Sequence, residues 1–256
     1  MTLTLERAIQ IAPSIGAIAP ANHVSSEYRF MPTHKFIGAF MEAGWEISDA
    51  KQIKARKRDP MFSKHMVSLQ HPDFGFTNNE LGTIRPRLTV INSHDWSSRL
   101  QVLLGMFRLI CTNGMVIETG KFTGLNVRHD ADLGVTLEDI STRFKGEASR
   151  LIETSNRWRA IDLSPVNRMD FVNAAGRLRW GDEYVPNTTP LDISRRIQDT
   201  GHDLWNTFNR VQENLMRGGA QFNGNRRARA ISNIDAERDI NTQLWNLAED
   251  FSNRLN

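Results

Sequence analysis

The hydrophobic periodicity of this 256-residue chain changes once, near residue 135, and this change limits the folds that the chain can adopt. Before that point, apolar and polar residues alternate over short runs, which is typical of strands with one buried face. After it, apolar residues recur every three or four positions, which is typical of amphipathic helices. We therefore expect an α+β fold in which a small antiparallel sheet is followed by an α-helical second half.

Within the first half, the apolar pattern predicts three strands flanked by helices. A helix is expected over residues 32–43, and Gly44 ends it. The strands are expected over residues 45–58, 62–71 and 84–92. The apolar stretch over residues 97–111 suits a helix that packs across this sheet, which gives the core a β-β-β-α order.

The second half is expected to hold four helices. They are predicted over residues 137–161, 165–180, 191–216 and 234–255, with a possible break of the third near Gly201. A loop rich in glycine and arginine, residues 218–230, separates the last two. The chain is thus expected to have three parts: a loosely held arm (1–30), an α+β core (31–135) and an α-helical extension packed on the core (136–256).

The composition is that of a globular protein. Hydrophobic residues make up 39% and charged residues 24% of the chain, which allows a packed core. No apolar run reaches the roughly 18–20 residues of a membrane span, and the start lacks the pattern of a secretory signal. Cys111 is the single cysteine, which excludes an internal disulfide. We expect a soluble cytoplasmic protein, in the host cytoplasm if a phage encodes it, with no membrane partner.

The basic residues change type along the chain. The net charge is only +3, but the last lysine is Lys145 and every later cation is arginine. The planar guanidinium binds phosphate in two places and stacks on aromatic rings or bases, so arginine is not equivalent to lysine. Codon bias of a GC-rich genome is the alternative explanation.

Strand parity gathers cations on one face of the predicted sheet. Side chains alternate between faces along a strand, so residues of opposite parity to the apolar set point away from the core. Those residues include Lys54, Arg56, Arg58, Lys64, Arg85 and Arg87. Clustered like charges destabilise a sheet face, which favours a polyanion as partner. The alternative is an ordinary solvated face.

Two further patterns point to nucleic acid. The loop carries Arg226, Arg227 and Arg229 after several glycines, and glycines let a backbone approach phosphates closely. Arginines also lie on both sides of Trp158 and at positions 177 and 179 before Trp180, and exposed tryptophans can stack on bases. The alternatives are a solvated loop without a ligand and tryptophans that belong to the core.

Histidine–aspartate pairs offer the one catalytic alternative. They are His71 with Asp73, His94 with Asp95, and His129 with Asp130 and Asp132. Imidazole and carboxylate groups bind divalent metals, which would allow metal-dependent phosphodiester cleavage. Such pairs also commonly cap turns. No GxSxG, HExxH or paired CxxC motif occurs, so we favour a non-enzymatic protein without a cofactor.

Short motifs carry a resemblance to a known family. The segments Arg108-Leu-Ile-Cys111-Thr-Asn113-Gly114-Met115, Arg227-Ala-Arg229-Ala-Ile and Asn241-Thr-Gln-Leu-Trp245 resemble a phage-, prophage- and plasmid-borne family. That family is catalogued as domain of unknown function 932. The resemblance covers the chain from about residue 25 onward. It implies a mobile-element origin and carries no known activity.

The β-β-β-α order is also similar to the core of phage single-strand annealing proteins. That similarity implies a positively charged groove, formed here by Lys54, Arg56, Lys64, Arg85 and Arg87, and assembly into rings or filaments. We therefore expect a non-catalytic protein that binds or anneals single-stranded nucleic acid and that can form homo-oligomers; DNA is the favoured ligand and RNA is the alternative. The alternatives are the metal-dependent nuclease and a phage protein that binds and inhibits a host enzyme.

Overall fold

The computed structural model describes residues 2–54, 59–74, 76–78, 82–108, 115–116, 125–127, 137–182, 186–222 and 226–255. The chain divides into two compact units. The first unit comprises Met1–Phe76, Arg85–Phe107 and Glu118–Ala148, and the second comprises Thr77–Ile84, Arg108–Ile117 and Ser149–Asn256. N-terminal helices, an antiparallel sheet and a helical C-terminal half confirm the predicted α+β class.

The first unit is built on a sheet with the central order β1-β2-β4-β5. The strand bounds are Glu46–Gln52 (β1), His65–Gln70 (β2), Phe76–Asn78 (β3), Gly82–Asn92 (β4), Leu100–Arg108 (β5) and Leu125–Val127 (β7). β2 runs antiparallel to both β1 and β4, and β7 runs antiparallel to β5. β3 pairs with β4. The predicted strands over residues 62–71 and 84–92 are thus confirmed as β2 and β4.

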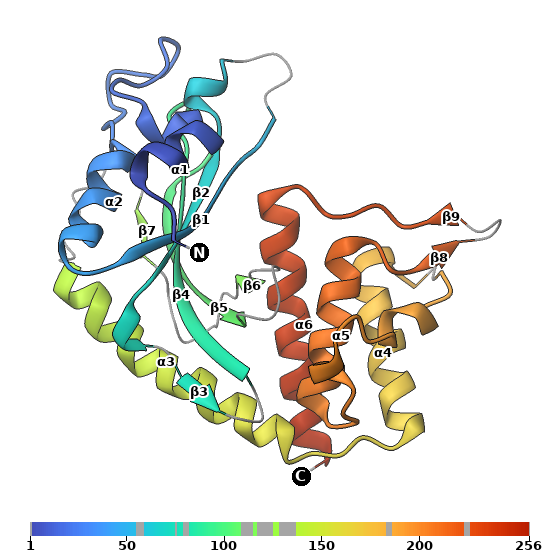
Figure 1. Ribbon diagram of the computed structural model, residues 1–256. Helices are drawn as coiled ribbons and strands as arrows, with labels where there is room; N and C mark the ends of the chain where they lie inside the picture. The colour runs from blue at the N-terminus through green and yellow to red at the C-terminus, as the bar shows by residue number, and fades with distance from the viewer. Residues whose placement is uncertain are drawn as a thin grey trace. The chain divides into compact units, whose positions relative to one another are not determined.

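Two helices pack on this sheet through apolar side chains. α1 (Leu5–Ile11) and α2 (Thr33–Glu42) both contact β1 (Figure 1). Ile37 and Phe40 of α2 are fully buried, as are the strand residues Ile47, Val67 and Val90. These strand residues lie on one face of the sheet, which the predicted alternation placed in the core, but the described residues of β2 are buried on both faces. α2 ends where Gly44 adopts a φ of 89°.

The first 30 residues, which we expected to form a loosely held arm, contain α1 and the 3-10 helix η1 (Pro13–Gly16). Leu3 donates a backbone hydrogen bond of 2.7 Å to Ile47, and Ala8 and Ile15 are fully buried. Ala8, Ala12 and Ala17 are small enough to pack closely and are buried, and Pro13 lies at the start of η1, where proline is tolerated.

The prediction of a helix over residues 97–111 is wrong, because this segment contains β5. Val102 and Leu103 are adjacent in sequence and both buried, so the strand is covered on both faces. A strand of this kind is a continuous apolar run, which periodicity cannot distinguish from a buried helix. The core therefore continues with a fourth strand where we expected a helix.

The second unit is helical. α3 (Leu137–Arg159) enters it from the first unit and is followed by α4 (Pro165–Trp180), α5 (Leu204–Arg217) and α6 (Ile234–Leu255). α4, α5 and α6 lie side by side in Figure 1, and each of the three contacts the other two. Trp158 of α3 is fully buried, with its ring centroid 4.4 Å from that of Trp245 and 5.2 Å from that of Phe208. Trp158 is therefore a core residue, which was the alternative to base stacking.

The predicted helices over residues 165–180 and 234–255 are confirmed at these bounds. The helix predicted over residues 191–216 begins only at Leu204, because the Asp203 side chain caps α5 there by accepting a hydrogen bond from the backbone of Asn206. The preceding residues form the 3-10 helices η4 (Thr189–Asp192) and η5 (Ile197–Asp199). Among the described residues, no helix has both the length and the apolar character that a bilayer crossing needs.

Candidate nucleic-acid interface

A β-bulge in β1 changes which side chains lie on the sheet face that was expected to carry cations. Ile47 pairs with Leu69, but Asp49 pairs with Ser68 and Ala50 with Val67, so Ser48 is an extra residue. A bulge of this kind reverses the alternation of faces for all later residues of the strand. Asp49, which strand parity placed on the core face, therefore lies on the face predicted to hold only cations.

Arg87 is buried on that face, with only 7% of its surface exposed. Its neighbours on β2 and β4, Ser68 and Thr89, are also buried and lie 3.3 Å apart through their hydroxyls. Asp49 is an exposed residue, but protein atoms packed around its carboxyl partly remove that group from water. This burial raises the pKa of the carboxyl. The charge of Arg87 opposes this increase in the pKa. Arg87 thus faces a carboxylate and does not contribute to an exposed cationic surface.

The other predicted sheet cations are only partly described. Lys54 is exposed and Lys64 is half-buried. Arg56, Arg58 and the Arg85 side chain lie outside the described residues. The described part of the sheet therefore does not bring the predicted cations together.

The predicted arginine loop forms a small hairpin in the second unit. β8 (Gln221–Phe222) pairs antiparallel with β9 (Arg226–Arg227), and the chain then continues through Arg229. Arg226, Arg227 and Arg229 are all exposed. We call β8, β9 and Arg229 the arginine hairpin.

Aromatic rings accompany these arginines. The guanidinium of Arg226 lies 5.4 Å from the ring centroid of Phe222. Phe222 in turn meets Trp180 of α4 edge-on, with the centroids 6.1 Å apart, and both rings are half-buried. The guanidinium of Arg179 also lies over the Trp180 ring, 5.0 Å from the ring centroid. The arrangement combines cations with aromatic faces, which is what sequence-tolerant strand binding uses.

The hairpin is fixed to the C-terminal end of α5. The chain turns there at Gly218, which has a φ of 81° and whose added Cβ would lie 2.0 Å from the carbonyl oxygen of Ala228. Ala228 donates a backbone hydrogen bond to Ala220, and Ile231 donates one to Met216. Arg179 of α4 donates to the backbone carbonyls of Leu215 and Arg229. These contacts give the exposed arginines a fixed support.

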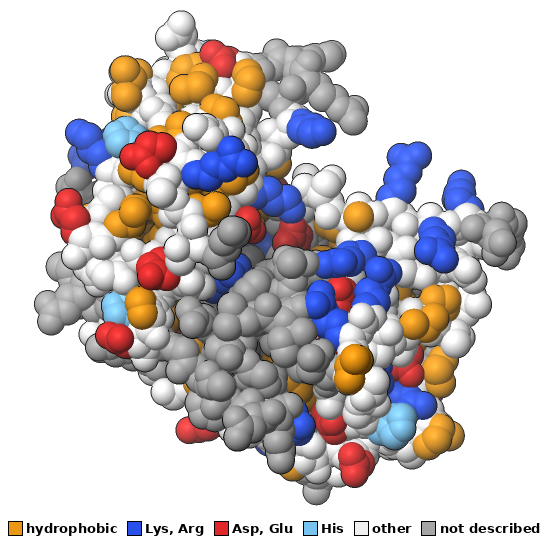
Figure 2. All heavy atoms as spheres, in the orientation of Figure 1, with side chains coloured by type: hydrophobic (Ala, Val, Ile, Leu, Met, Phe, Trp, Pro, Cys, Tyr) orange, Lys and Arg blue, Asp and Glu red, His pale blue; other side chains and the backbone are white. Residues whose placement is uncertain are grey.

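A second group of arginines lies at the same end of α5 and forms ion pairs and hydrogen bonds with side chains of that helix. Arg196 donates two hydrogen bonds to Glu213, which is 3% exposed, and Arg217 lies 3.4 Å from the same carboxylate. Arg195 donates to the side-chain oxygen of Asn214. Figure 2 shows Lys and Arg side chains gathered over α5 and beside the β8–β9 hairpin. Cations at a helix C-terminus also interact favourably with the negative end of the helix dipole.

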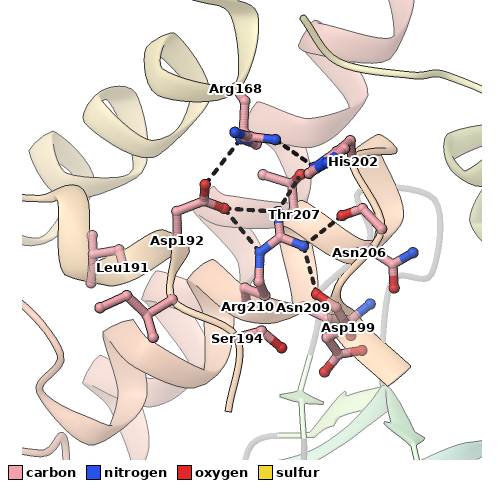
Figure 3. A network of polar contacts seen from close by, with 12 residues as sticks. Arg168, Leu191, Asp192, Ser194, Asp199, His202, Asn206, Thr207, Asn209 and Arg210 are labelled. Carbon is pink, nitrogen blue, oxygen red and sulfur yellow. Dashed lines mark hydrogen bonds and ion pairs between the residues drawn. The ribbon is translucent and has the colours of Figure 1, made fainter. Parts of the chain in front are cut away.

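The polar face of α5 is covered by the segment between α4 and α5 (Figure 3). Arg210 is 4% exposed and donates to Asp192 at 2.9 Å and to the carbonyls of Asp199 and Gly201 at 2.6 Å each. Asp192 also binds Arg168 of α4 at 3.0 Å. Sequence reasoning missed this network, because polar residues on a helix are ordinarily expected to face solvent.

The histidine–aspartate pairs serve local structure where they are described. The His71 and Asp73 side chains lie 3.7 Å apart. His94 is fully buried, and Asp95 accepts a hydrogen bond from the backbone of Ser97, which is a turn cap. Within the described ranges, no three His, Cys, Asp or Glu side chains are grouped as metal ligands. His129, Asp130 and Asp132 lie outside these ranges.

Comparison with known proteins identifies relatives over nearly the whole chain. Residues 20–245 match the family model described as Domain of unknown function (DUF932). The UPF0380 proteins YfjQ and YafZ of Escherichia coli (strain K12) are each 30% identical to this chain over 261 residues, covering 99% of it and 93% of the relative. No solved structure matches the chain. The chain therefore belongs to the family called domain of unknown function 932.

Proposed function

We propose that the protein binds single-stranded nucleic acid without catalysis, as a single-strand binding or annealing protein, through the arginine hairpin. The supporting observation is the exposure of Arg226, Arg227 and Arg229 on a fixed hairpin. No ion pair joins these three guanidinium groups to a carboxylate within the described part of the chain. Phosphate groups would supply the missing anions.

The chemistry of the hairpin favours strands over small anions. Each guanidinium can donate two parallel hydrogen bonds to a phosphate. The half-buried rings of Phe222 and Trp180 lie beside the cations, where an unpaired base can stack on an aromatic face or on a guanidinium plane. Every base has such a face, so the proposed binding depends little on sequence.

Three further parts of the proposal rest on the sequence. We propose DNA as the usual ligand, a cytoplasmic location, and assembly of several copies along one strand. Lys54 and Lys64 stay in the proposal as secondary contacts from the first unit, together with Arg56, Arg58 and Arg85. Arg87 is left out, because it is buried beside Asp49.

A charge-matched comparison tests the hairpin. The triple variant Arg226→Gln, Arg227→Gln, Arg229→Gln should weaken binding of a labelled oligo(dT) by about tenfold or more, because each lost phosphate contact weakens binding and releases fewer counterions. The control variant Arg7→Gln, Arg143→Gln, Arg254→Gln removes three exposed cations elsewhere and loses the same net charge. It should bind almost as the wild type does. Equal losses in the two variants would contradict a site at the hairpin.

The same assay separates binding from catalysis. Incubation of the labelled oligonucleotide with the protein and Mn²⁺ or Mg²⁺ should leave the strand intact. Cleavage that disappears on mutation of His71 or Asp73 would instead support the metal-dependent nuclease. Capture of a host enzyme from a nuclease-treated lysate, combined with no binding of oligo(dT), would support the inhibitor hypothesis.

A further inference from the structure

Trp96 differs from the other five tryptophans of the chain. It is 50% exposed, whereas Trp45, Trp158, Trp205 and Trp245 are at most 5% exposed and Trp180 is half-buried. All six are described, so this comparison covers every tryptophan in the sequence. Indole is costly to leave in water, since an aromatic side chain gains much of its stabilising effect from burial. The exposed indole of Trp96 therefore has no evident role in the core.

The backbone at Trp96 is held in an unfavourable conformation. Its φ is 64°, and no other non-glycine residue in the described ranges has a positive φ. This left-handed conformation costs about 1–2 kcal/mol for a residue with a Cβ. Strain of this kind persists where the surroundings determine it, and it is concentrated at functional sites.

The surrounding turn between β4 and β5 is fixed by hydrogen bonds. The backbone of Ser97 donates to Asp95 at 3.0 Å, and the backbone of Ser98 donates to the Ser93 hydroxyl at 2.9 Å. The hydroxyl of Tyr28 donates to the Ser93 carbonyl at 2.9 Å. The turn thus holds the Trp96 backbone in one conformation.

The indole is supported from within the first unit. The Tyr28 ring is buried, and its centroid lies 5.7 Å from that of Trp96 at an interplanar angle of 43°. Arg99 follows in the same connection and is exposed, as is Arg29 next to Tyr28. The indole is therefore a preformed planar surface, with Arg99 three residues after it in the chain and Arg29 next to the tyrosine that supports it.

We propose that Trp96 is a binding residue on which an unpaired nucleobase stacks. This inference rests on the proposed function and adds a base contact in the first unit to the phosphate contacts of the hairpin. A planar ligand with adjacent phosphates matches an exposed indole that has the exposed Arg99 three residues later in the chain. Because only an unpaired base exposes its face, the contact selects single strands over duplexes.

A glycine substitution tests the inference without damaging the fold. Glycine adopts a positive φ without strain, so Trp96→Gly should have an unfolding midpoint close to that of the wild type, because the relieved strain offsets the lost Tyr28 contact and the greater freedom of glycine in the unfolded chain. Its affinity for oligo(dT) should nevertheless fall about tenfold, because stacking contributes roughly 1–3 kcal/mol per base. The salt dependence of binding should not change, since no phosphate contact is removed. Trp96→Phe should retain much of the affinity.

Fluorescence gives an independent readout. Oligo(dT) should quench the emission of the wild-type protein by stacking on the exposed indole of Trp96, and Trp96→Phe should lose this part of the quenching while any part that comes from Trp180 at the hairpin remains. Wild-type affinity in Trp96→Gly would overturn the inference and leave the hairpin proposal intact if the hairpin variant still loses binding. A change in oligomeric state of Trp96→Gly with unchanged oligo(dT) affinity would assign Trp96 to a protein contact and also overturn it. Failure of the wild type to bind oligo(dT) would reject both proposals.

Discussion

At the scale of single residues, Arg210 shows how the second unit accommodates a buried charge. Its guanidinium donates to Asp192, to Thr207 and to two backbone carbonyls, so each side of the ion has a partner. Removing one member of a buried ion pair leaves the other uncompensated, which costs about 3–5 kcal/mol.

We therefore predict that Arg210→Met lowers the free energy of unfolding by about 3 kcal/mol, a value reduced from the upper limit because Asp192 keeps its bond to Arg168. Urea denaturation of the variant measures the effect. Arg254→Met, on the exposed end of α6, is the control and should change stability by less than about 1 kcal/mol. Similar stabilities for the two variants would show that the Arg210 network contributes little.

His65 gives the first unit a dependence on pH. It is fully buried, with Nδ1 2.8 Å from the Ser14 hydroxyl and Nε2 2.8 Å from the Thr33 hydroxyl. Burial lowers the pKa of His65 to about 4, against the opposing effects of the Ser63 carbonyl and Asp95. The unfolded chain, with an ordinary histidine pKa near 6.5, therefore binds the proton more readily than the folded protein.

It follows that His65 contributes full stability above about pH 6.5 and that this contribution is lost as the pH falls toward 4, by roughly 3 kcal/mol at most. Urea denaturation at pH 7.5, 6.0 and 5.0 should show this decline. His65→Gln, which cannot take up a proton, should show a shallower decline between pH 6.5 and 5. An equally steep decline in that variant would assign the effect to other groups.

At the scale of elements, the glycine that turns the chain into the arginine hairpin is expected to tolerate no side chain. Gly218 needs its positive φ, and a Cβ there would collide with the Ala228 carbonyl. We predict that Gly218→Ala destabilises the protein by at least about 2 kcal/mol and weakens oligo(dT) binding, because the hairpin loses its fixed position.

Gly146 provides the matched control for that substitution. It lies inside α3, and a Cβ added there would meet no atom within 4 Å. Gly146→Ala should raise stability by up to about 1 kcal/mol through helix propensity. Thermal unfolding of both variants is the measurement. A neutral Gly218→Ala would show that the turn tolerates rearrangement.

The predictability of the elements depended on whether their ends carry local signals. α4 could be predicted to the residue because Pro165 follows the capping residue Ser164 and Gly181 ends the helix with a φ of 75°. β5 and the β1 bulge could not be predicted. The apolar run of β5 lacks a distinctive period, and the extra residue Ser48 is detected only through its pairing partner on β2.

The candidate site was predicted unevenly for the same reason. The exposure of Arg226, Arg227 and Arg229 follows from a glycine-rich loop, which sequence reveals directly. The burial of Arg87 beside Asp49 depends on strand register and on the residues that cover the sheet, which sequence does not reveal. Trp96 was missed because it lies in the turn between β4 and β5, at the point where the sequence pattern predicted the start of a helix.

At the scale of the whole molecule, the two units are proposed to contribute different interactions. The second unit supplies guanidinium groups on a fixed hairpin, and the first supplies a planar indole on a strained turn. The phosphate contacts respond to salt and the stacking contact does not. This difference allows the two contributions to be measured separately in one intact protein.

The most direct test is the salt dependence of oligo(dT) affinity. For single strands, the slope of log affinity against log salt concentration changes by about 0.7 for each phosphate contact. The variant with Arg226, Arg227 and Arg229 replaced by glutamine should have a slope shallower than the wild type by about 2, while Trp96→Gly should keep the wild-type slope. An unchanged slope in the triple variant would contradict phosphate binding by the arginine hairpin.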